Sequence, residues 1–446
     1  MRNEVAMAKR PNILMFITHD TGRHLGCYGR KVVTPNLDAL AESGVVFDNY
    51  FCTAPQCSPS RASILSGKWP HNHGLIGLTH RGFAMGSYDH LLPKLMAEAG
   101  FDTWLFGMQH EIHGPASTLG YQHRQFDEQR GNGCEVVTPF VLDYLRSEPK
   151  QPFYACVGYS ETHRPFPPSD VSPSAVDPVG YLPDVDAVRQ DVADLEVLVR
   201  RVDDHVGQVV DALKKAGLYD DTLIVFTTDH GVAMPRAKAT LFDPGVETAL
   251  IMKFPYDRHA GTRVGAMALN IDYLPTLCDF VGVDVPTDVQ GTSLMPLVRG
   301  EAASPHDALF FEMTYHAAYD PMRAVRTQRH KYIRSFVERP MYFAPNTDAG
   351  HAKEYLRAEG WFDAPRPAEQ LYDLDADPYE QNNVIDDPAY AEVADELRAR
   401  LREWMESTHD PLLAGQVPAP VGARVTRPTG YEAKDTIVVT ADSPIE

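Results

Sequence analysis

The chain has 446 residues, which is long enough for one large domain and a smaller one. It carries 61 acidic against 41 basic residues, a formal net charge of −20, and this excess disfavours nucleic acid as a partner because neutralising phosphates needs a basic surface. No run approaches the ~20 apolar residues of a membrane helix, and the polar segment Met1 to Pro11 contains no apolar signal sequence. We therefore expect a cytoplasmic protein with neither a nucleic acid nor a membrane as partner.

The first two thirds of the chain alternate apolar strands with helices. We predict strands at residues 11–18, 45–48, 102–106, 153–159 and 222–228, and helices at 34–44, 91–99 and 191–216. Such alternation implies an α/β fold in which a mostly parallel sheet is sandwiched by helices. The Pro-rich stretch 165–183 is predicted to be a long active-site loop.

Polar residues follow two of these apolar strands. His19 and Asp20 come directly after the strand 11–18, and Asp229 and His230 come directly after the strand 222–228. In open α/β sheets ligands collect beyond the carboxyl ends of the strands, so these side chains are well placed to hold a metal ion. Imidazole softens the ligand set and suits Mn, Zn or Fe better than Ca. Two alternatives to a role as metal ligands stay open. The His19 side chain could point away from the metal site, and Asp229 could simply cap the following turn.

Near residue 300 the pattern changes. Short strands are predicted at 308–312, 322–326 and 331–336, and a helix at 388–405. We therefore divide the chain into a large α/β domain, residues 1–300, and a smaller α+β subdomain, residues 301–446. The acidic run 369–383 is interpreted as structural. The tail beyond Gly415 could wrap over its own domain or over a neighbouring subunit, which leaves a homo-oligomer open.

One short segment indicates the chemistry. It reads Cys57-Ser58-Pro59-Ser60-Arg61 and leads through a short helix to Gly67. This resembles the sulfatase signature, in which a formylglycine-generating enzyme oxidises the cysteine to formylglycine. The resemblance implies that the hydrated aldehyde is the nucleophile, with one hydroxyl to attack sulfur and a second whose deprotonation expels the sulfate. The alternative is that Cys57 is a small buried apolar residue at a helix start.

The six cysteines, at 27, 52, 57, 134, 156 and 278, are scattered and include no Cys-x-x-Cys pair. This spacing favours free thiols in a reducing compartment. A bridge between Cys52 and Cys57 would consume the formylglycine precursor, and we do not expect it.

The resemblance, to sulfatases of the alkaline-phosphatase superfamily, also implies roles for other residues. His110 falls on the histidine that contacts the hydrated aldehyde, and His163 on the histidine that faces the leaving group. Arg61 would hold the diol, and Lys238 matches a sulfate-binding lysine. Taken alone, each is typical of a structural residue, but together they follow the family's chain order. Met108 stands where the family has a second lysine and offers no charge to a sulfate oxygen.

The same resemblance implies one divalent metal ion, most often calcium in the family. Its ligands here would be Asp20, Asp229, His230 and the side chain of residue 57, with His19 as a further candidate. Most sulfatases carry Asp-Asp and Asp-Asn at the two strand ends, so His-Asp and Asp-His leave Mn or Zn open.

Three further segments look most like N-sulfoglucosamine sulfohydrolases: residues 71–74, 321–326 and 408–411. The resemblance implies a small sulfated substrate, such as a saccharide, with Glu312, His316 and Arg323 reaching over the pocket to the sugar. The alternative is an exposed polar strand edge. Two rival functions stay open. One is a phosphonate monoester or phosphodiester hydrolase, since sulfur and phosphorus centres share in-line geometry. The other is a binder of sulfated ligands without turnover, suggested by Met108.

Overall fold

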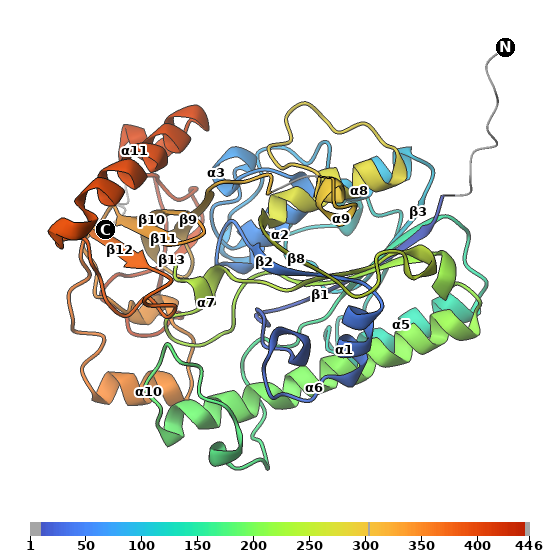
Figure 1. Ribbon diagram of the computed structural model, residues 1–446, viewed down its shortest axis with the longest axis horizontal. Helices are drawn as coiled ribbons and strands as arrows, with labels where there is room; N and C mark the ends of the chain where they lie inside the picture. Colours follow the sequence, from blue (N-terminus) through green and yellow to red (C-terminus); the bar gives the residue numbers. More distant parts are fainter. Residues whose placement is uncertain (1–9, 302–303, 442–446) are drawn as a thin grey trace.

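The computed structural model describes residues 10–301 and 304–441. Its large sheet has eight strands, which are β1 (Asn12–Thr18), β2 (Val45–Phe51), β3 (Asp102–Gly107), β4 (His123–Gln125), β5 (Phe153–Gly158), β6 (Thr222–Thr228), β7 (Leu250–Lys253) and β8 (Thr262–Leu269). They lie in the order β4-β3-β5-β1-β6-β7-β2-β8 (Figure 1). Every neighbouring pair is parallel except the two that β7 makes, with β6 and with β2. The predicted mostly parallel sheet is confirmed.

Strand β1 lies near the middle of this sheet, and all seven of its residues are buried. In the register of the sheet, Thr18 of β1 lies opposite Thr228 of β6, and Ile17 lies opposite Gly158 of β5. The residues that follow these three strands therefore emerge at one edge of the sheet. This edge is where ligands of open α/β sheets collect.

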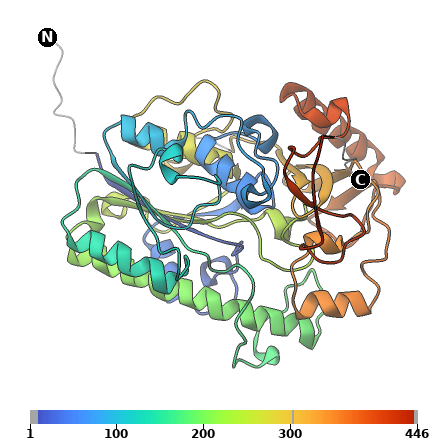
Figure 2. The same ribbon diagram turned by 180° about the vertical axis from the view of Figure 1, so that it is seen from behind.

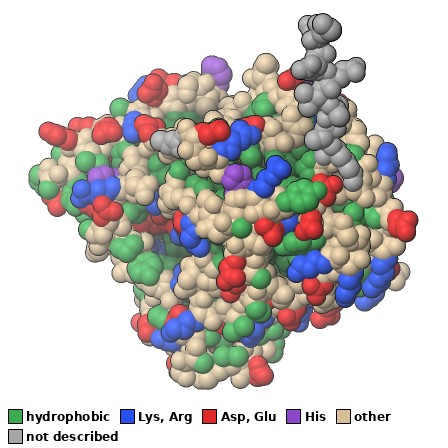
Figure 3. Space-filling view, turned by 45° about the vertical axis from the view of Figure 1, so that its right-hand side comes forward, with side chains coloured by type: hydrophobic (Ala, Val, Ile, Leu, Met, Phe, Trp, Pro, Cys, Tyr) green, Lys and Arg blue, Asp and Glu red, His purple; other side chains and the backbone are tan. Residues whose placement is uncertain are grey.

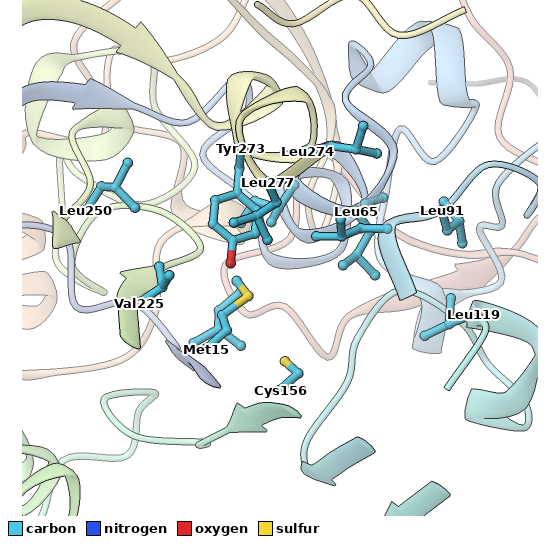
Figure 4. Close-up of a cluster of buried hydrophobic side chains, with 14 of the residues drawn as sticks. Met15, Leu65, Leu91, Leu119, Cys156, Val225, Leu250, Tyr273, Leu274 and Leu277 are labelled. Carbon is cyan, nitrogen blue, oxygen red and sulfur yellow. The ribbon is translucent and has the colours of Figure 1, made fainter. Parts of the chain in front are cut away.

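Helices cover both faces of the sheet (Figure 1). One face packs against α2 (Cys57–Ser66), α4 (Leu92–Glu98) and α8 (Tyr273–Val281), and the other against α1 (Pro35–Glu42), α5 (Cys134–Arg146) and α6 (Asp186–Lys215). Figure 4 shows Tyr273 of α8 reaching toward Met15 of β1 in the first of these cores. The helical sandwich is thus confirmed, and α6 begins five residues earlier than predicted.

Several helices and strands of the structure were not predicted from the sequence. Strand β4 has only three residues, and β8 is partly exposed at the edge of the sheet, so neither shows a continuous apolar run. Helix α5 contains Pro139 in its interior, which is a helix-breaking signal in a sequence.

The smaller subdomain contains an antiparallel sheet of β9 (Leu309–Tyr315), β10 (Tyr319–Arg326), β11 (His330–Ser335) and β12 (Glu369–Asp373), in the order β12-β11-β10-β9. Helix α11 (Ala391–Ser407) covers it. The start of the acidic run forms β12, and its turn begins only afterwards. Core residues of this sheet pack with Phe51, Trp69 and Leu269 of the large domain. The exact boundary near residue 300 stays a prediction.

The tail beyond Gly415 folds back onto its own chain (Figure 2). It forms a ribbon of β13 (Arg424–Thr426) and β14 (Thr436–Val438), and the Thr426 amide donates to the Ala317 carbonyl at 2.8 Å. Within residues 10–301 and 304–441, no helix has the length and apolarity needed to cross a bilayer. On the face drawn in Figure 3, Lys and Arg side chains lie among Asp and Glu.

Candidate active site

Cys57 is the first residue of α2 and is almost wholly buried, with 2% of its surface exposed. The serines that follow it tie the helix to the strand ends and the neighbouring loop. The Ser60 hydroxyl donates to the Asp229 carbonyl, and the Ser58 hydroxyl accepts from the Thr79 amide at 3.2 Å. The signature segment therefore fixes the first turn of α2, and with it the Cys57 side chain. All six cysteines are free thiols, as predicted.

The two acidic strand ends meet beside Cys57. The Asp20 amide donates to Asp229 Oδ1 at 2.9 Å, and Cys57 Sγ lies 4.0 Å from Asp20 Oδ1. Burial alone raises the pKa of Asp229, but the charges of His230 and other neighbours outweigh it and hold that pKa well below its usual range. The charge of Lys238 likewise outweighs burial at Asp20 and holds the pKa of that carboxyl well below its usual range. Both carboxylates are therefore ionised and fully buried, which requires compensating positive charge.

Four of the predicted metal ligands converge. They are His19, Asp20, Cys57 and Asp229. Each offers one ligand atom, and these four atoms all lie within 4.8 Å of one another. His19 is fully buried, and its Nδ1 lies 3.0 Å from Asp229 Oδ2, yet neither ring nitrogen has hydrogen-bond geometry to a partner. Buried polar atoms without partners are rare in native proteins. Together with two carboxylates, these nitrogens fit a divalent metal ion that accepts mixed nitrogen and oxygen ligands.

The structure brings His230 to the same place. Its Nδ1–H donates to the Gly231 carbonyl at 2.9 Å, so Nε2 is the ring nitrogen that faces the site. This Nε2 lies 3.3 Å from Cys57 Sγ and 3.1 Å from Asp20 Oδ1. It is within reach of two other predicted ligands, and its role as a ligand stays a prediction.

Arg61 lies beneath the two carboxylates and is fully buried. Its Nε donates to Asp229 Oδ2 at 3.1 Å, and its Nη2 donates to the Thr18 carbonyl at 3.2 Å. The remaining nitrogen, Nη1, is buried without a partner. Arg61 thus balances the charge of Asp229 and keeps one donor unused.

Lys238 lies on the other side of Asp20. Its Nζ donates to Asp20 Oδ2 at 2.7 Å and lies 3.0 Å from Asp348 Oδ2. Burial by itself lowers the pKa of Lys238, but these carboxylates outweigh it and hold the pKa well above the usual value. Lys238 is therefore a buried, permanently charged cation within the site.

His163 lies at the mouth of the site, with 42% of its side chain exposed. Its Nδ1–H donates to the Arg164 carbonyl at 2.6 Å, and its Nε2 lies 3.3 Å from Lys238 Nζ. The structure therefore directs Nε2 toward the site from the solvent side.

His110 approaches from the end of β3 and is paired with His80. Its Nε2 lies 3.0 Å from His80 Nδ1, and the two rings stack with centroids 5.2 Å apart. Its other nitrogen, Nδ1, is buried without a partner. Met108 stands where the resemblance to sulfatases implies a lysine that this chain lacks. It lines a small interior cavity with Arg61 and apolar residues such as Leu105.

Two of the three residues predicted to contact a sugar lie in the interior. Glu312 and Arg323 are buried, with Glu312 Oε1 at 2.8 Å from His71 Nδ1 and Arg323 Nη2 at 3.4 Å from Glu312 Oε2. Arg323 also donates from Nε to Asp410 at 2.5 Å. We therefore correct the prediction for this pair, because both side chains are committed to a buried ion-pair network and present no surface to a ligand.

This network gives a testable pH dependence. Burial alone raises the pKa of Glu312, but the attraction of His71 and Arg323 outweighs it and lowers that pKa below 4.5. A carboxyl with a lowered pKa stabilises the fold above its unfolded pKa, and the contribution disappears as the pH falls through the folded value. Glu312→Gln should thus cost about 3 kcal/mol at pH 7, and the difference from wild type should shrink below about pH 4.5. Urea unfolding of both proteins across pH measures it, and a pH-independent difference would contradict it. His73, whose pKa responds to the charge of Glu312, and Asp410, which accepts from Arg323, are further ionisable groups of this network.

His316, the third of the predicted sugar contacts, does lie at the site. Burial and the charge of Lys238 lower its pKa to about 3, so its ring is neutral. The charges of Asp348 and Cys57 also act on it, and its Nδ1 is buried without a partner.

His80 and Asp348 were not predicted from the sequence. His80 belongs to a segment with three histidines, His71, His73 and His80, which is the only signal that could have found it. Asp348 lies in a polar loop before a helix, where Asp is usually a cap or turn residue.

Comparison with known proteins agrees with this geometry. Residues 11–283 match the sulfatase family model, and residues 235–344 match the model of the N-sulphoglucosamine sulphohydrolase C-terminal region. The human N-sulphoglucosamine sulphohydrolase is 28% identical over 91% of this chain and 91% of its own length.

Two solved structures share the fold. One is described as bound to its substrate, D-glucosamine-2-N,6-O-disulfate, and superposes with a TM-score of 0.71 at 22% identity, covering 90% of this chain and 99% of its own. The other is a phosphonate monoester hydrolase of Agrobacterium radiobacter, with a TM-score of 0.68 at 22% identity, covering 91% and 97%. Because the sulfatase model matches more than half of the chain, the protein belongs to the sulfatase family, hydrolases of sulfuric esters or sulfur–nitrogen bonds.

Proposed function

We propose that the protein is a metal-dependent sulfatase that removes sulfate from a sulfated saccharide, as a sulfate ester or an N-sulfate, through a formylglycine hydrate derived from Cys57. The observation that carries this proposal is the position of Cys57, at the start of α2 and within 4.8 Å of the ligand atoms of His19, Asp20 and Asp229. An ordinary structural cysteine has no need of two ionised carboxylates beside it.

Asp20, Asp229 and the side chain of residue 57 would hold the metal ion, with imidazole nitrogens from His19 and His230 completing the set. Manganese or zinc suits this mixture of ligands better than calcium. When bound, the ion lowers the pKa of the aldehyde hydrate and neutralises sulfate oxygens.

The chain's own cations bind the sulfate. Lys238 presents a permanent charge next to Asp20, and Arg61 keeps Nη1 as an unused buried donor. Charge-assisted hydrogen bonds from such donors are the strong contacts that an anion makes in a site shielded from water.

His163 is the proposed proton donor to the leaving oxygen or nitrogen. Because its Nδ1–H is engaged by the Arg164 carbonyl, Nε2 is the nitrogen that would take up and deliver the proton. It faces the site from the exposed side, and in the neutral ring it accepts from the Lys238 ammonium. A departing sugar leaves toward solvent, so a donor at the mouth has the right placement.

His110 is the proposed base. Burial, together with the charge of Arg81, lowers the pKa of His80 to about 4, so His80 is neutral at pH 7. If His110 donates from Nε2 to His80 Nδ1, its unpartnered Nδ1 carries the lone pair that accepts a proton. His80 would thereby stabilise the tautomer of His110 that has its proton on Nε2 and its lone pair on Nδ1.

An N-sulfated glucosamine is the proposed substrate. The human relative, which aligns over nine tenths of both chains, is named for this activity, and the C-terminal family model bears the same name. A phosphonate monoester or phosphodiester hydrolase is the second candidate, because Met108 supplies no charge where sulfatases have a lysine and Asp229 is followed by His230.

Paired kcat/KM values on an N-sulfated glucosamine, an aryl sulfate and a phosphodiester separate the candidates. We expect the N-sulfated sugar to be hydrolysed best, by at least about tenfold over the phosphodiester. Preference for the phosphodiester would favour the second candidate, and binding of the sugar without turnover of any substrate would identify a non-catalytic binder.

The proposal includes a cytoplasmic location and leaves a homo-oligomer open. Six free cysteines support a reducing compartment. Fractionation of the source cells tests the location, and recovery of the protein outside the cytoplasm would contradict it.

A further inference from the structure

Lys238 is shared between two carboxylates. On one side lies Asp20 at 2.7 Å, and on the other lies Asp348 at 3.0 Å. Asp348 comes from the loop before α10 (His351–Ala358), in the smaller subdomain. Its side chain is 23% exposed. Oδ2 is buried against the Lys238 ammonium, so the exposed remainder of the carboxylate is the part that can face a ligand at the site.

The Asp348 loop is held in a fixed position. Asn346 Oδ1 accepts from the amides of Ala317 and Ala318, at 3.0 and 2.9 Å, which ties the loop to the turn that carries His316. Lys353 Nζ donates to the loop carbonyls of Ala344 at 3.1 Å and Thr347 at 2.8 Å. The same Nζ lies 3.2 Å from the Tyr431 carbonyl in the C-terminal tail. Recognition sites need this rigid support, because a loosely held group loses its preference for one ligand geometry.

The charge of Asp348 restricts what it can contact. Burial alone raises the pKa of Asp348, but the charge of Lys238 outweighs it and lowers the pKa, so the carboxylate is ionised. A carboxylate accepts hydrogen bonds only and repels sulfate oxygens. A substrate whose sulfate lies against Lys238 must therefore place a donor, and not a second anion, against Asp348.

We propose that Asp348 is a specificity-determining residue that accepts a hydrogen bond from the sugar hydroxyl next to the sulfated position. The inference rests on the proposed sulfated-saccharide substrate and deepens it. His316 is neutral, and its Nδ1 has no partner. It lies in the turn that Asn346 joins to the Asp348 loop, and it contributes a second polar contact. An aryl sulfate, which has no such hydroxyl, gains nothing from Asp348.

The test compares three substrates with the metal-loaded, formylglycine-containing enzyme. These are N-sulfoglucosamine, its 3-deoxy analogue and an aryl sulfate. Wild type should lose about 10- to 100-fold in kcat/KM on the deoxy analogue, because the analogue lacks the hydroxyl that would donate to Asp348. Asp348→Ala should lose a similar factor on N-sulfoglucosamine and should no longer distinguish the deoxy analogue. Its loss on the aryl sulfate, which it can suffer only through Lys238, should be clearly smaller than its loss on the sugar.

Asp363→Ala removes an exposed carboxylate of the same subdomain and is the matched control, which should leave all three values unchanged. Asp348→Asn preserves the side-chain shape and should shift the ratio in the same direction if the alanine variant does not fold. Equal losses on sugar and aryl sulfate would overturn the inference, since Asp348 would then act only through Lys238. If wild type hydrolyses aryl sulfate but neither sugar, the proposed function falls and the inference with it, whereas sugar hydrolysis unaffected by Asp348 variants overturns the inference alone.

Discussion

Replacement of Asp229 by alanine is expected to remove the bound metal ion and to lower kcat by at least about 10³-fold. Asp229 is the strand-end carboxylate that contacts the Asp20 amide, the His230 amide and the Arg61 guanidinium at once. Its loss removes a ligand and releases the peptide groups that position another ligand. Metal content by elemental analysis and kcat on an aryl sulfate measure the two effects.

The alanine variant also leaves the Arg61 charge buried without its partner, which costs about 3–5 kcal/mol of folding free energy. Asp229→Asn is therefore the more conservative variant, because it retains the shape and one acceptor oxygen. Asp203→Ala is the matched control. This carboxylate is also buried, but it accepts from Asn36 and from the Leu37 amide at 2.7–3.2 Å, between α6 and α1. Full metal content in Asp229→Ala would contradict the assignment.

The second large effect separates the two catalytic histidines. His163→Ala should reduce kcat by about 10²–10⁴-fold on substrates with poor leaving groups and much less on activated aryl sulfates, because only a poor leaving group needs a proton. His110→Ala should instead trap sulfated enzyme after one turnover, since the base that completes the cycle is missing. Leaving-group series and intact-protein mass after a single turnover distinguish the two.

Equal losses across leaving groups, with no trapped enzyme, would refute this division. His123→Ala is a useful control, because that histidine is on the same sheet but contacts Asp102 at 3.1 Å and stacks on Trp104, away from Cys57. It should leave both measurements unchanged.

The parallel sheet and the acidic strand ends were predictable because they leave strong local signals. Strands β1 and β6 are buried on both faces, so they read as continuous apolar runs, and the residues directly after them must emerge at the same edge. The sequence therefore predicts that Asp20 and Asp229 lie close together. The nucleophile, residue 57, was predicted from the resemblance of its segment to the sulfatase signature.

The prediction failed where function depends on side-chain direction in the smaller subdomain. Glu312 and Arg323 lie on neighbouring strands, directly opposite in register, and face inward. A shift of one residue would have turned both to the other face, and nothing in their local sequence distinguishes a buried ion pair from a ligand contact. His80 and Asp348 lie in loops, whose path is fixed by distant contacts such as those of Lys353 and Asn346.

The proposed catalysis depends above all on conversion of Cys57 to formylglycine. The protein should be produced beside a formylglycine-generating enzyme, and the tryptic peptide that ends at Arg61 analysed by mass spectrometry. We expect the Cys57 sulfur to be replaced by oxygen with loss of two hydrogens, with or without an added water for the hydrate. A peptide that retains the thiol in a fully active preparation would contradict the central claim.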